Sequence, residues 1–580
     1  MTDAAPRWWH ETTIYQVYPR SFADSNGDGL GDLAGVTDHL DHLVDLGVGS
    51  VWLSPFFVSP QEDFGYDVAD YCDVAPEYGD LAAADHLIEA AHDRGLRVLL
   101  DLVLNHTSDQ HPWFRLSKAS RSNPRSDWYL WRDGRGRGGR KPPNNWRSAM
   151  EVATAWQWGA ERQQWYLATF LPFQPDLNYR NPDVRHAMFD AVRFWLDRGV
   201  DGFRLDIFGA IMKDPAYRDN PLGPHVGGTE TRIWERRYTE NTEDAFQLAK
   251  DLRAVVDEYG DPERILIGEV FGDPAVLRRY LGDDDGLHLV FLFDFLAFRY
   301  SADYFRGRIT TYEEEYPAPL QPTYVLENHD RTRLLDRVGG DEAKARTLAV
   351  LLCTLRGVPC IYQGQELGLA NTPLPLSTAR DPIHRTFFSW LPEAVVSRLP
   401  ELLNRDVVRT PIPWTSGPNA GFTTPEAEPW LPLGPDSGAR NVAAQTDQDG
   451  SMLELYRALL TLRRERPALH RGSLELVAAD PAWPDVLAFR RVDEAAGGDG
   501  SSDRVAVVVN LGADPAEVRV AALVGAASQD VSPQALVATA DHVTVGERVV
   551  VLPAHSAVVV DLVPSPSTAQ WREPAPQVRD

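Results

Sequence analysis

The sequence predicts an α/β fold, a (β/α)8 barrel with an inserted subdomain after its third strand and a C-terminal antiparallel β-sandwich domain. Short runs rich in β-branched residues alternate with amphipathic stretches over most of the first two thirds of the chain, which indicates βα units and a parallel sheet. Eight such runs occur, and eight parallel strands are the number that closes a TIM barrel. From about residue 471 such runs follow one another without long helices, which predicts a separate antiparallel β domain.

The eight expected strands are short apolar segments, and several of them end in polar or charged residues. The strands begin at Ile14, Val48, Leu96, Gly202, Arg264, Leu287, Pro322 and Val358. The polar residues at their ends are Asn105, His106, Arg204, Asp206, Glu269, His329 and Asp330. Because the carboxyl ends of all barrel strands share one face, these residues are expected to surround one pocket although they lie far apart in the sequence.

The long gap between the third and fourth strands is expected to hold the inserted subdomain. The gap is rich in Trp, Pro, Gly and Arg, as in DGRGRGGRKPPNNW, and a structureless loop of that length is rare inside a compact domain. A second irregular, Pro-rich stretch runs from Asn371 to about 450 and is expected to overhang the same face. We therefore place the barrel at residues 1–105 and 175–470, the inserted subdomain at 106–174, the β domain at 471–563 and a disordered tail at 564–580.

The composition is that of a globular protein with an acidic surface. The 580 residues include 57 Lys and Arg against 84 Asp and Glu, a formal net charge of −27. Such a surface excludes broad electrostatic capture of nucleic acid or anionic lipid. The cysteines Cys72, Cys353 and Cys360 have no metal-ligand spacing, and neither a leader nor a membrane-spanning run is recognisable. We expect a cytoplasmic protein with reduced thiols.

Three carboxylates stand at the ends of expected strands: Asp206 in GFRLD, Glu269 in LIGEV and Asp330 in ENHD. Two carboxyl groups that face each other across a scissile bond are what glycoside hydrolysis requires. Arg204 lies two residues before Asp206, so both side chains point to the same face of a strand, and a guanidinium there is expected to keep Asp206 ionised. Any one acid alone is better explained as a helix cap or a surface ion pair. Three acids at the ends of parallel strands favour a catalytic site.

Four segments in the same order resemble the motif regions of the α-amylase family of glycoside hydrolases. They are DLVLNH at 101–106, GFRLD at 202–206, GEV at 268–270 and ENHD at 327–330. A fifth segment, QPDLN at 174–178, is similar to the mark of the oligo-1,6-glucosidase and α-glucosidase branch. GYDVADY, YQGQELGL and RTPIPW also resemble that branch. The resemblance covers about residues 8 to 470.

The resemblance implies a role for each motif residue. Asp206 is the implied nucleophile that forms a β-glucosyl-enzyme, Glu269 is the implied general acid and then base, and Asp330 is expected to bind sugar hydroxyls and stabilise the distorted transition state. The residues implied to surround the first glucose are His106, Arg204 and His329, with Tyr66 stacked beneath its ring.

Asp67 and Arg409 resemble the pair that, in this branch, holds the non-reducing-end glucose and closes the site behind it. A closed pocket implies an exo-acting enzyme that removes one glucose from a short substrate. The alternative for Arg409 is a surface salt bridge in the Pro-rich segment.

Two further positions bear on the linkage that is cleaved. Ile207 follows the implied nucleophile, where α-1,6-acting members tend to carry Val and α-1,4-acting members Thr or Ala, so its bulky β-branched side chain favours α-1,6 or another linkage over α-1,4. Glu327 stands where Gly or Asn is common. An extra carboxylate there is expected to bind a polar aglycone at the second subsite, to favour transfer over hydrolysis, or to support the site from behind.

The segment DSNGDGLGD spaces oxygen-bearing residues in the way that wraps a hard cation. Its candidate ligands are Asp24, Asn26, Asp28, the Leu30 carbonyl and Asp32. The alternative is an ordinary acidic Gly-rich turn. Because the family carries a similar metal loop after the first strand, we expect a structural Ca²⁺, with Mg²⁺ as the second choice.

The sequence therefore predicts a retaining, exo-acting α-glucosidase that releases glucose from short α-glucosides, with some transglucosylation. A sucrose isomerase or an α-glucosyltransferase on the same scaffold is the main alternative, which only product analysis separates from the first. A non-catalytic relative of the transporter-associated kind is a remote alternative, because such proteins carry a membrane span and tend to lose the catalytic acids. The basic run at 133–143 is expected to be a solvated loop rather than an RNA-binding patch, and most tryptophans to serve packing. We expect a monomer or homodimer.

Overall fold

The structure is a computed structural model that describes residues 7–149, 153–227, 230–388, 404–494, 502–524 and 531–564. Contacts divide the chain into two compact units. The first unit comprises Met1–Phe298, Thr311–Glu342 and Gly357–Thr461, and the second comprises Arg299–Thr310, Ala343–Arg356 and Leu462–Asp580.

The first unit contains a closed barrel, which confirms the predicted fold class. The eight strands are β1 (Ile14–Val17), β2 (Ser50–Leu53), β5 (Arg97–Leu102), β9 (Gly202–Leu205), β12 (Ile265–Gly268), β13 (Leu289–Leu292), β14 (Thr323–Val325) and β15 (Val358–Tyr362). They are neighbours in the order β1-β15-β14-β13-β12-β9-β5-β2, and the pairings are parallel. Each strand coincides with one of the eight apolar runs.

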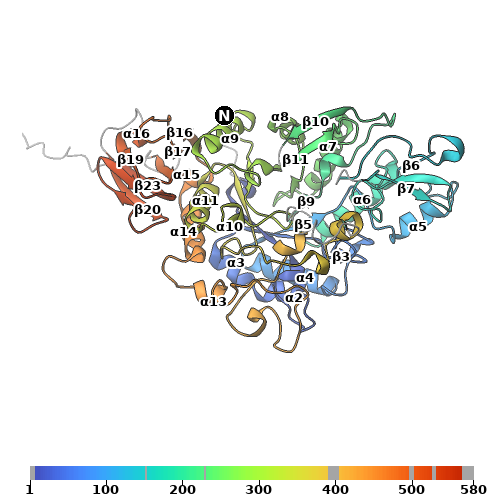
Figure 1. The fold of residues 1–580 in the computed structure, drawn as a ribbon, viewed down its shortest axis with the longest axis horizontal. Coiled ribbons are helices and arrows are strands. Elements are labelled where there is room, and N and C mark those ends of the chain that lie inside the picture. The colour runs from blue at the N-terminus through green and yellow to red at the C-terminus, as the bar shows by residue number, and fades with distance from the viewer. Residues whose placement is uncertain are drawn as a thin grey trace, which may run out of the picture. The chain divides into compact units, whose positions relative to one another are not determined.

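The strands close because their side chains are buried on both faces. The interior is filled by Ile14, Trp52, Leu99, Ile267 and Phe291 among others, so the barrel is a packed core rather than a pore. Helices cover the strands from outside (Figure 1). They include α2 (Leu33–Asp38), α3 (Leu40–Leu46), α4 (Leu81–Asp93), α6 (Pro182–Asp197), α7 (Glu243–Val256) and α8 (Pro274–Leu281). Helices α9 (Ala302–Glu315) and α11 (Glu342–Thr354) fall mostly in the second unit.

Short elements complete the first unit. The helices are α1 (Trp8–Glu11), α10 (Leu334–Arg337), α13 (Val442–Gln445) and α14 (Met452–Glu465), and the strands are β3 (Phe57–Val58), β4 (Asp70–Val74), β10 (Leu222–Gly227) and β11 (Glu230–Trp234). Across the described ranges, no helix combines the length and the apolar character needed to cross a membrane.

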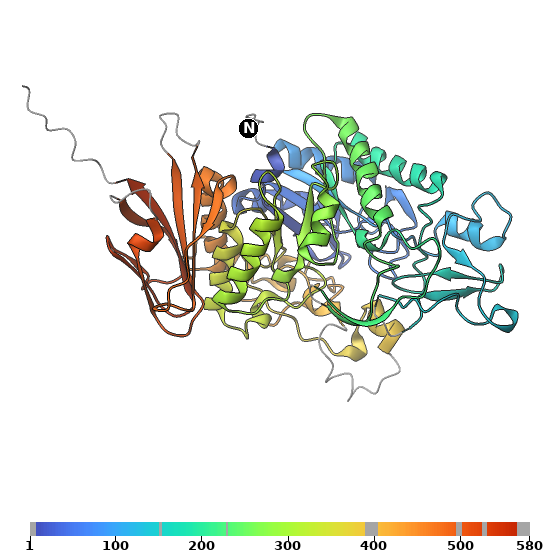
Figure 2. The same ribbon diagram turned by 90° about the horizontal axis from the view of Figure 1, so that it is seen from above.

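The segment between β5 and β9 forms its own small sheet. Helix α5 (Pro112–Ala119) precedes strands β6 (Trp131–Arg132), β7 (Trp156–Gly159) and β8 (Gln164–Leu167), which pair antiparallel in the order β6-β8-β7. The segment projects from one side of the barrel unit in both views (Figure 1, Figure 2). Trp146 and Trp156 stack at 5.9 Å between ring centroids in its core, so both serve packing.

The second unit is an antiparallel sandwich, as predicted. One sheet has the order β16 (Ser473–Leu476), β17 (Val486–Asp493), β18 (Asp503–Asn510), β23 (Ser556–Pro564) and β20 (Val531–Ala538). The other has the order β19 (Ala516–Arg519), β22 (Val549–Leu552) and β21 (Thr544–Val545). Helices α15 (Pro467–His470) and α16 (Val520–Val524) accompany them.

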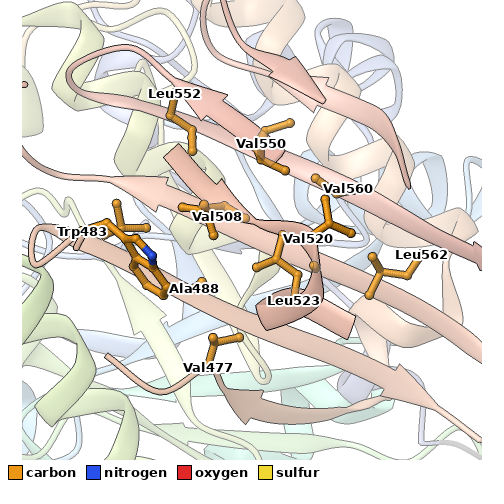
Figure 3. Packing of buried hydrophobic residues seen from close by; sticks show 14 residues of the cluster. Val477, Trp483, Ala488, Val508, Val520, Leu523, Val550, Leu552, Val560 and Leu562 are labelled. Carbon is orange, nitrogen blue, oxygen red and sulfur yellow. The ribbon is translucent and has the colours of Figure 1, made fainter. Parts of the chain in front are cut away.

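Valines and leucines from both sheets form one core with Trp483, which holds the two sheets together (Figure 3). Of the predicted disordered tail, residues 565–580 lie outside the described ranges.

Candidate active site

Three acids lie at the carboxyl ends of barrel strands, where the sequence placed them. Asp206 follows β9 directly, Glu269 follows β12, and Asp330 lies in the loop after β14. The side chains of Asp206 and Glu269 are 10% and 7% exposed, and that of Asp330 is 29% exposed, so Asp330 is the most open of the three. The acids that are distant in sequence thus share one end of the barrel.

Arg204, on β9, binds three carboxylates at once. Its Nη1 lies 2.8 Å from an Asp101 oxygen and 2.9 Å from Asp206 Oδ1, and its Nη2 donates to Glu269 Oε2. The guanidinium is 2% exposed. Asp101 lies within the apolar run of β5, and sequence reasoning did not single it out as a site residue. A charged residue in a fully buried strand was the available signal, because such a group is kept only when it is paired.

Burial and the charge of Arg204 act in opposite directions on the pKa of Asp206. Burial raises the pKa of the Asp206 carboxyl well above its usual range, and negative charge on Glu269 and Asp101 adds to a rise that Arg204 opposes. Burial also raises the pKa of Asp101 to about 6. Arg204 favours the ionised form of Asp206, while its one positive charge is divided among three carboxylates. The cluster retains a proton at a pH at which an exposed carboxyl has lost it.

The two oxygens of Glu269 have different surroundings. Oε2 accepts from Arg204 and from the backbone N–H of Ile207 at 3.2 Å. Ile207 has φ +37° and ψ +40°, a left-handed conformation that is strained for a β-branched residue and costs on the order of 1–3 kcal/mol. Oε1 is therefore the oxygen that these two donors leave open. Ile207 thus contributes its amide to the site as well as the side chain that the sequence singled out.

Two guanidinium groups hold Asp330. Its Oδ1 lies 2.7 Å from Arg409 Nη2 and 3.2 Å from Arg405 Nη1. Burial alone would raise the pKa of Asp330, but the neighbouring His329 and these two arginines outweigh it and lower the pKa far below the usual range. Burial lowers the pKa of His329 itself well below its usual range, so the guanidinium groups supply the lasting positive charge. Asp330 is therefore an anion at neutral pH.

Tyr66 and His329 stack on each other, and the stacking of Tyr66 beneath a glucose ring stays a prediction. Their rings stack with centroids 5.4 Å apart and an interplanar angle of 4°, and Tyr66 Oη lies 2.7 Å from His329 Nε2. Tyr66 also donates to Asp101 at 3.1 Å. His106 Nε2 contacts the Tyr66 carbonyl at 3.1 Å, and burial lowers the pKa of His106 to about 4, so it is neutral at pH 7.

The predicted pair of Asp67 and Arg409 is not formed in the structure. Asp67 Oδ1 accepts from Ser59 and from the Asp63 amide, and Oδ2 accepts from the Glu62 amide, so Asp67 shapes its own loop. Arg409 binds Asp330 and the His329 carbonyl.

The ion pair that joins these two segments is Asp63 with Arg405, at 2.9 Å. Each partner precedes the predicted residue by four positions, in DFGYD and RDVVR. Asp63 and Arg405 are therefore functional candidates that sequence reasoning missed.

Glu327 does not face the substrate side. Its Oε2 lies 3.2 Å from Arg333 Nη1, its Oε1 accepts from the Leu334 amide at 2.7 Å, and the side chain is 2% exposed. The prediction that Glu327 lines the second subsite is corrected, because its carboxylate is used to hold the start of α10. These contacts agree with the alternative, in which Glu327 supports the site from behind.

Lys213 explains the unusual segment DIFGAIMKD after Asp206. Its ammonium is 2% exposed and contacts Asn105 Oδ1 at 2.6 Å and Asp176 Oδ2 at 2.5 Å. Asp176 belongs to the QPDLN segment, and Asn105 follows β5. Lys213 thus ties the loop after Asp206 to the two points at which the chain leaves the barrel for the inserted subdomain and returns from it.

The loop from Asp24 to Asp32 is shaped by its own carboxylates. Asp24 accepts from the amides of Asn26, Gly27 and Gly29 at 2.7–3.0 Å. Asp32 caps α2 by accepting from the Gly35 amide. In the part of the chain that the structure describes, no group of three or more His, Cys, Asp or Glu side chains that could hold a metal comes together. The donors of this loop are oxygen atoms alone, a set that suits a hard cation, and the calcium site stays a prediction.

Comparison with known proteins places the chain in a family. A family model for the α-amylase catalytic domain matches residues 16–472, most of the chain. The chain belongs to the α-amylase family. This confirms the prediction of a glycoside hydrolase. Its curated relatives include proteins named as an alpha-glucosidase and an oligo-1,6-glucosidase, which confirms the resemblance to that branch.

The relatives of this α-amylase family member match over most of their length. A probable alpha-glucosidase of Rhizobium meliloti (strain 1021) is 42% identical over 487 residues, which cover 81% of this chain and 85% of the relative. An oligo-1,6-glucosidase of Parageobacillus thermoglucosidasius is 35% identical over 511 residues, which cover 82% of this chain and 87% of the relative.

Two solved structures share the fold of this α-amylase family member. The alpha-glucosyl transfer enzyme XgtA superposes with a TM-score of 0.85 at 39% identity. The trehalulose synthase MutB from Pseudomonas mesoacidophila MX-45 superposes with a TM-score of 0.84 at 32% identity. Each comparison covers 96% of this chain and 100% of the other.

Proposed function

We propose that the protein is a retaining, exo-acting α-glucosidase that releases glucose from the non-reducing end of short α-glucosides. The observation that carries this proposal is that Arg204 donates to both Asp206 and Glu269 from one guanidinium. Two carboxyl groups bound to one such group are close together, and retaining enzymes need a separation of about 5 Å, too short for a water between them. Direct attack by a carboxylate on the sugar is therefore favoured over direct attack by water.

The atoms of the cluster suggest a sequence of steps. Asp206 Oδ1 is held by Arg204, so Oδ2 attacks the anomeric carbon and forms a β-glucosyl-enzyme. Glu269 is the group that gives a proton to the leaving oxygen and later takes one from water. Asp330 stays ionised and accepts hydrogen bonds from sugar hydroxyls, which strengthen as the oxocarbenium-like transition state develops. Two inversions return the α configuration.

Proton NMR of the first product tests the retaining mechanism. p-Nitrophenyl α-glucoside is supplied to the enzyme, because its aglycone releases no glucose of its own, and the α anomer of glucose should appear before mutarotation. Early β-glucose would exclude the retaining mechanism. The ratio of the rates on maltose and isomaltose measures the linkage preference to which Ile207 is expected to contribute.

A glucosyl-transferring or isomerising enzyme is the second candidate. It is favoured by the likeness to structures named as an alpha-glucosyl transfer enzyme and a trehalulose synthase. Sucrose and trehalose distinguish the candidates: free glucose that accumulates in proportion to turnover supports hydrolysis, whereas a new disaccharide at constant free glucose supports the alternative.

A cytoplasmic location is also a proposal, supported by three free cysteines.

Asp63 is expected to hold the far end of the first glucose together with Arg405. Asp63→Ala removes a buried carboxylate that binds Arg405 at 2.9 Å and Gln174 at 2.9 Å. We expect kcat/KM for maltose to fall about 10²-fold, since a charged hydrogen bond contributes about 1.5–3 kcal/mol. The wild type should not cleave a maltooligosaccharide whose non-reducing end is chemically blocked. An unchanged kcat/KM, or wild-type cleavage of the blocked substrate, would contradict a closed pocket.

We also propose that the loop from Asp24 to Asp32 binds a structural Ca²⁺. Treatment with EDTA is expected to lower the midpoint of thermal unfolding by about 2–4 °C, and added Ca²⁺ to restore it, because an ion that binds only the folded state stabilises it. Asp28→Asn is the matched variant and should abolish the response. Scanning fluorimetry with Ca²⁺ and Mg²⁺ in parallel identifies the ion, and a midpoint that neither EDTA nor added ion shifts would refute the site.

A further inference from the structure

Arg405 lies at the centre of a second buried charge cluster. Its Nη2 contacts Asp63 at 2.9 Å, and its Nη1 contacts Asp330 at 3.2 Å, so it joins the loop after β3 to the candidate site. The guanidinium is 12% exposed. A planar group with five fixed donors bridges two acids only when its plane is set correctly. A further contact must therefore fix the orientation of the Arg405 guanidinium plane.

Asp381 provides the fixed attachment. Its Oδ2 lies 2.9 Å from Arg405 Nε and its Oδ1 lies 3.1 Å from Arg405 Nη2, a two-point contact along one edge of the guanidinium. Asp381 Oδ2 also accepts from the backbone N–H of Arg405 at 2.6 Å. Asp381 is fully buried, at 0% exposed. The acid thus fixes both the backbone and the side chain of Arg405.

A carboxylate next to Arg405 in turn binds the backbone around Asp381. Asp406 Oδ2 accepts from the amides of Arg380 and Asp381, at 2.6 and 3.2 Å. Two carboxylates therefore join the short segment around Asp381 to the segment that carries Arg405, and Asp381 also accepts from the Ile383 amide at 2.9 Å. Asp381 binds Arg405 at three points, and none of its hydrogen bonds in the described part of the chain goes to the three candidate catalytic acids, so its effect on the site acts through Arg405.

We propose that Asp381 is a positioning residue that sets the plane of Arg405 and thereby keeps the non-reducing-end side of the sugar pocket closed. The proposal rests on the proposed exo-acting function. With Asp381 in place, the edge of Arg405 is occupied, and one donor remains for Asp63 and one for Asp330. Without Asp381, the guanidinium turns to make a two-point contact with one of those acids, and the bridge between them opens.

The test is the kinetics of Asp381→Asn on maltose and isomaltose. Asparagine keeps the size but loses the charge and one acceptor, so KM should rise about 10-fold while kcat stays within about 3-fold, the pattern of lost binding common to substrate and transition state. Asp201→Asn is the matched control. Asp201 is also 0% exposed and pairs with Arg97 at 2.9 Å, but it precedes β9 at the opposite end of the strand. It should lower the unfolding midpoint without changing KM.

A double-mutant cycle separates positioning from general destabilisation. If Asp381 acts through Arg405, adding Asp381→Asn to Arg405→Ala changes KM by less than about 2-fold, whereas independent effects multiply. Should Asp381→Asn not fold, Asp381→Glu, which keeps the charge at a different reach, is expected to raise KM selectively as well. A normal KM in a folded variant, or multiplicative effects in the cycle, would overturn the proposal. Wild-type enzyme that releases no glucose from any substrate would instead overturn the proposed function.

Discussion

Asp206→Ala is expected to lower kcat for p-nitrophenyl α-glucoside by at least about 10⁴-fold, because no other carboxylate oxygen is placed to form the glucosyl-enzyme. Azide should restore part of the turnover by attacking from the vacated side, and the product should be β-glucosyl azide. The fold should survive, since Arg204, which binds Asp206 at 2.9 Å, keeps its contacts with Asp101 and Glu269 when the Asp206 carboxylate is removed. Steady-state kinetics and NMR of the azide product measure both outcomes.

Glu269→Ala gives the opposite pattern and serves as the comparison. A good leaving group needs no acid, so the first step should persist on p-nitrophenyl α-glucoside, and azide should then yield the α product with retained configuration. Asp214→Asn is the matched control, since Asp214 pairs with the exposed Arg218 at 2.9 Å and should leave kcat unchanged. Normal activity in Asp206→Ala, or the same azide anomer from both variants, would disprove the assigned roles.

The barrel could be predicted from the sequence because its strands are buried on both faces. Strand β12, for example, is a continuous apolar run that is followed directly by Glu269, a pattern that local composition reveals. The catalytic candidates Asp206 and Glu269 followed from the same rule, since each directly follows a strand. Asp101 could have been found by the same reasoning, as a charge inside an apolar run.

The loops could not be predicted in the same way. Asp63 and Asp67 lie in one irregular segment, as do Arg405 and Arg409, and neither segment has a periodicity that says which side chain turns inward. The choice depends on contacts with distant residues, such as Gln174 for Asp63 and Asp381 for Arg405. Glu327 shows the same limit, because its partner Arg333 is determined by the turn that begins α10.

Arg204→Met is expected to cause the largest combined loss of stability and activity. Methionine keeps much of the volume but leaves Asp101, Asp206 and Glu269 without their shared positive charge, and removing one partner of a buried ion pair costs about 3–5 kcal/mol. Activity should fall together with stability, because the carboxylates then hold more protons and Glu269 loses a donor to Oε2. Arg97→Met is the control: this arginine pairs with Asp201 but is 33% exposed, so its loss should cost less.

The stability lost in Arg204→Met is expected to increase with pH. The folded cluster has raised pKa values, about 6 for Asp101 and well above the usual range for Asp206, whereas the same groups titrate near about 4 in the unfolded chain. Between these values the folded state binds more protons, so its free energy of unfolding falls as the pH rises. Without Arg204 the pKa values rise further and the fall extends to higher pH. The difference in unfolding midpoint between wild type and Arg204→Met should therefore widen from pH 5 to pH 8 in scanning fluorimetry, and a constant difference would mean that Arg204 acts by packing alone.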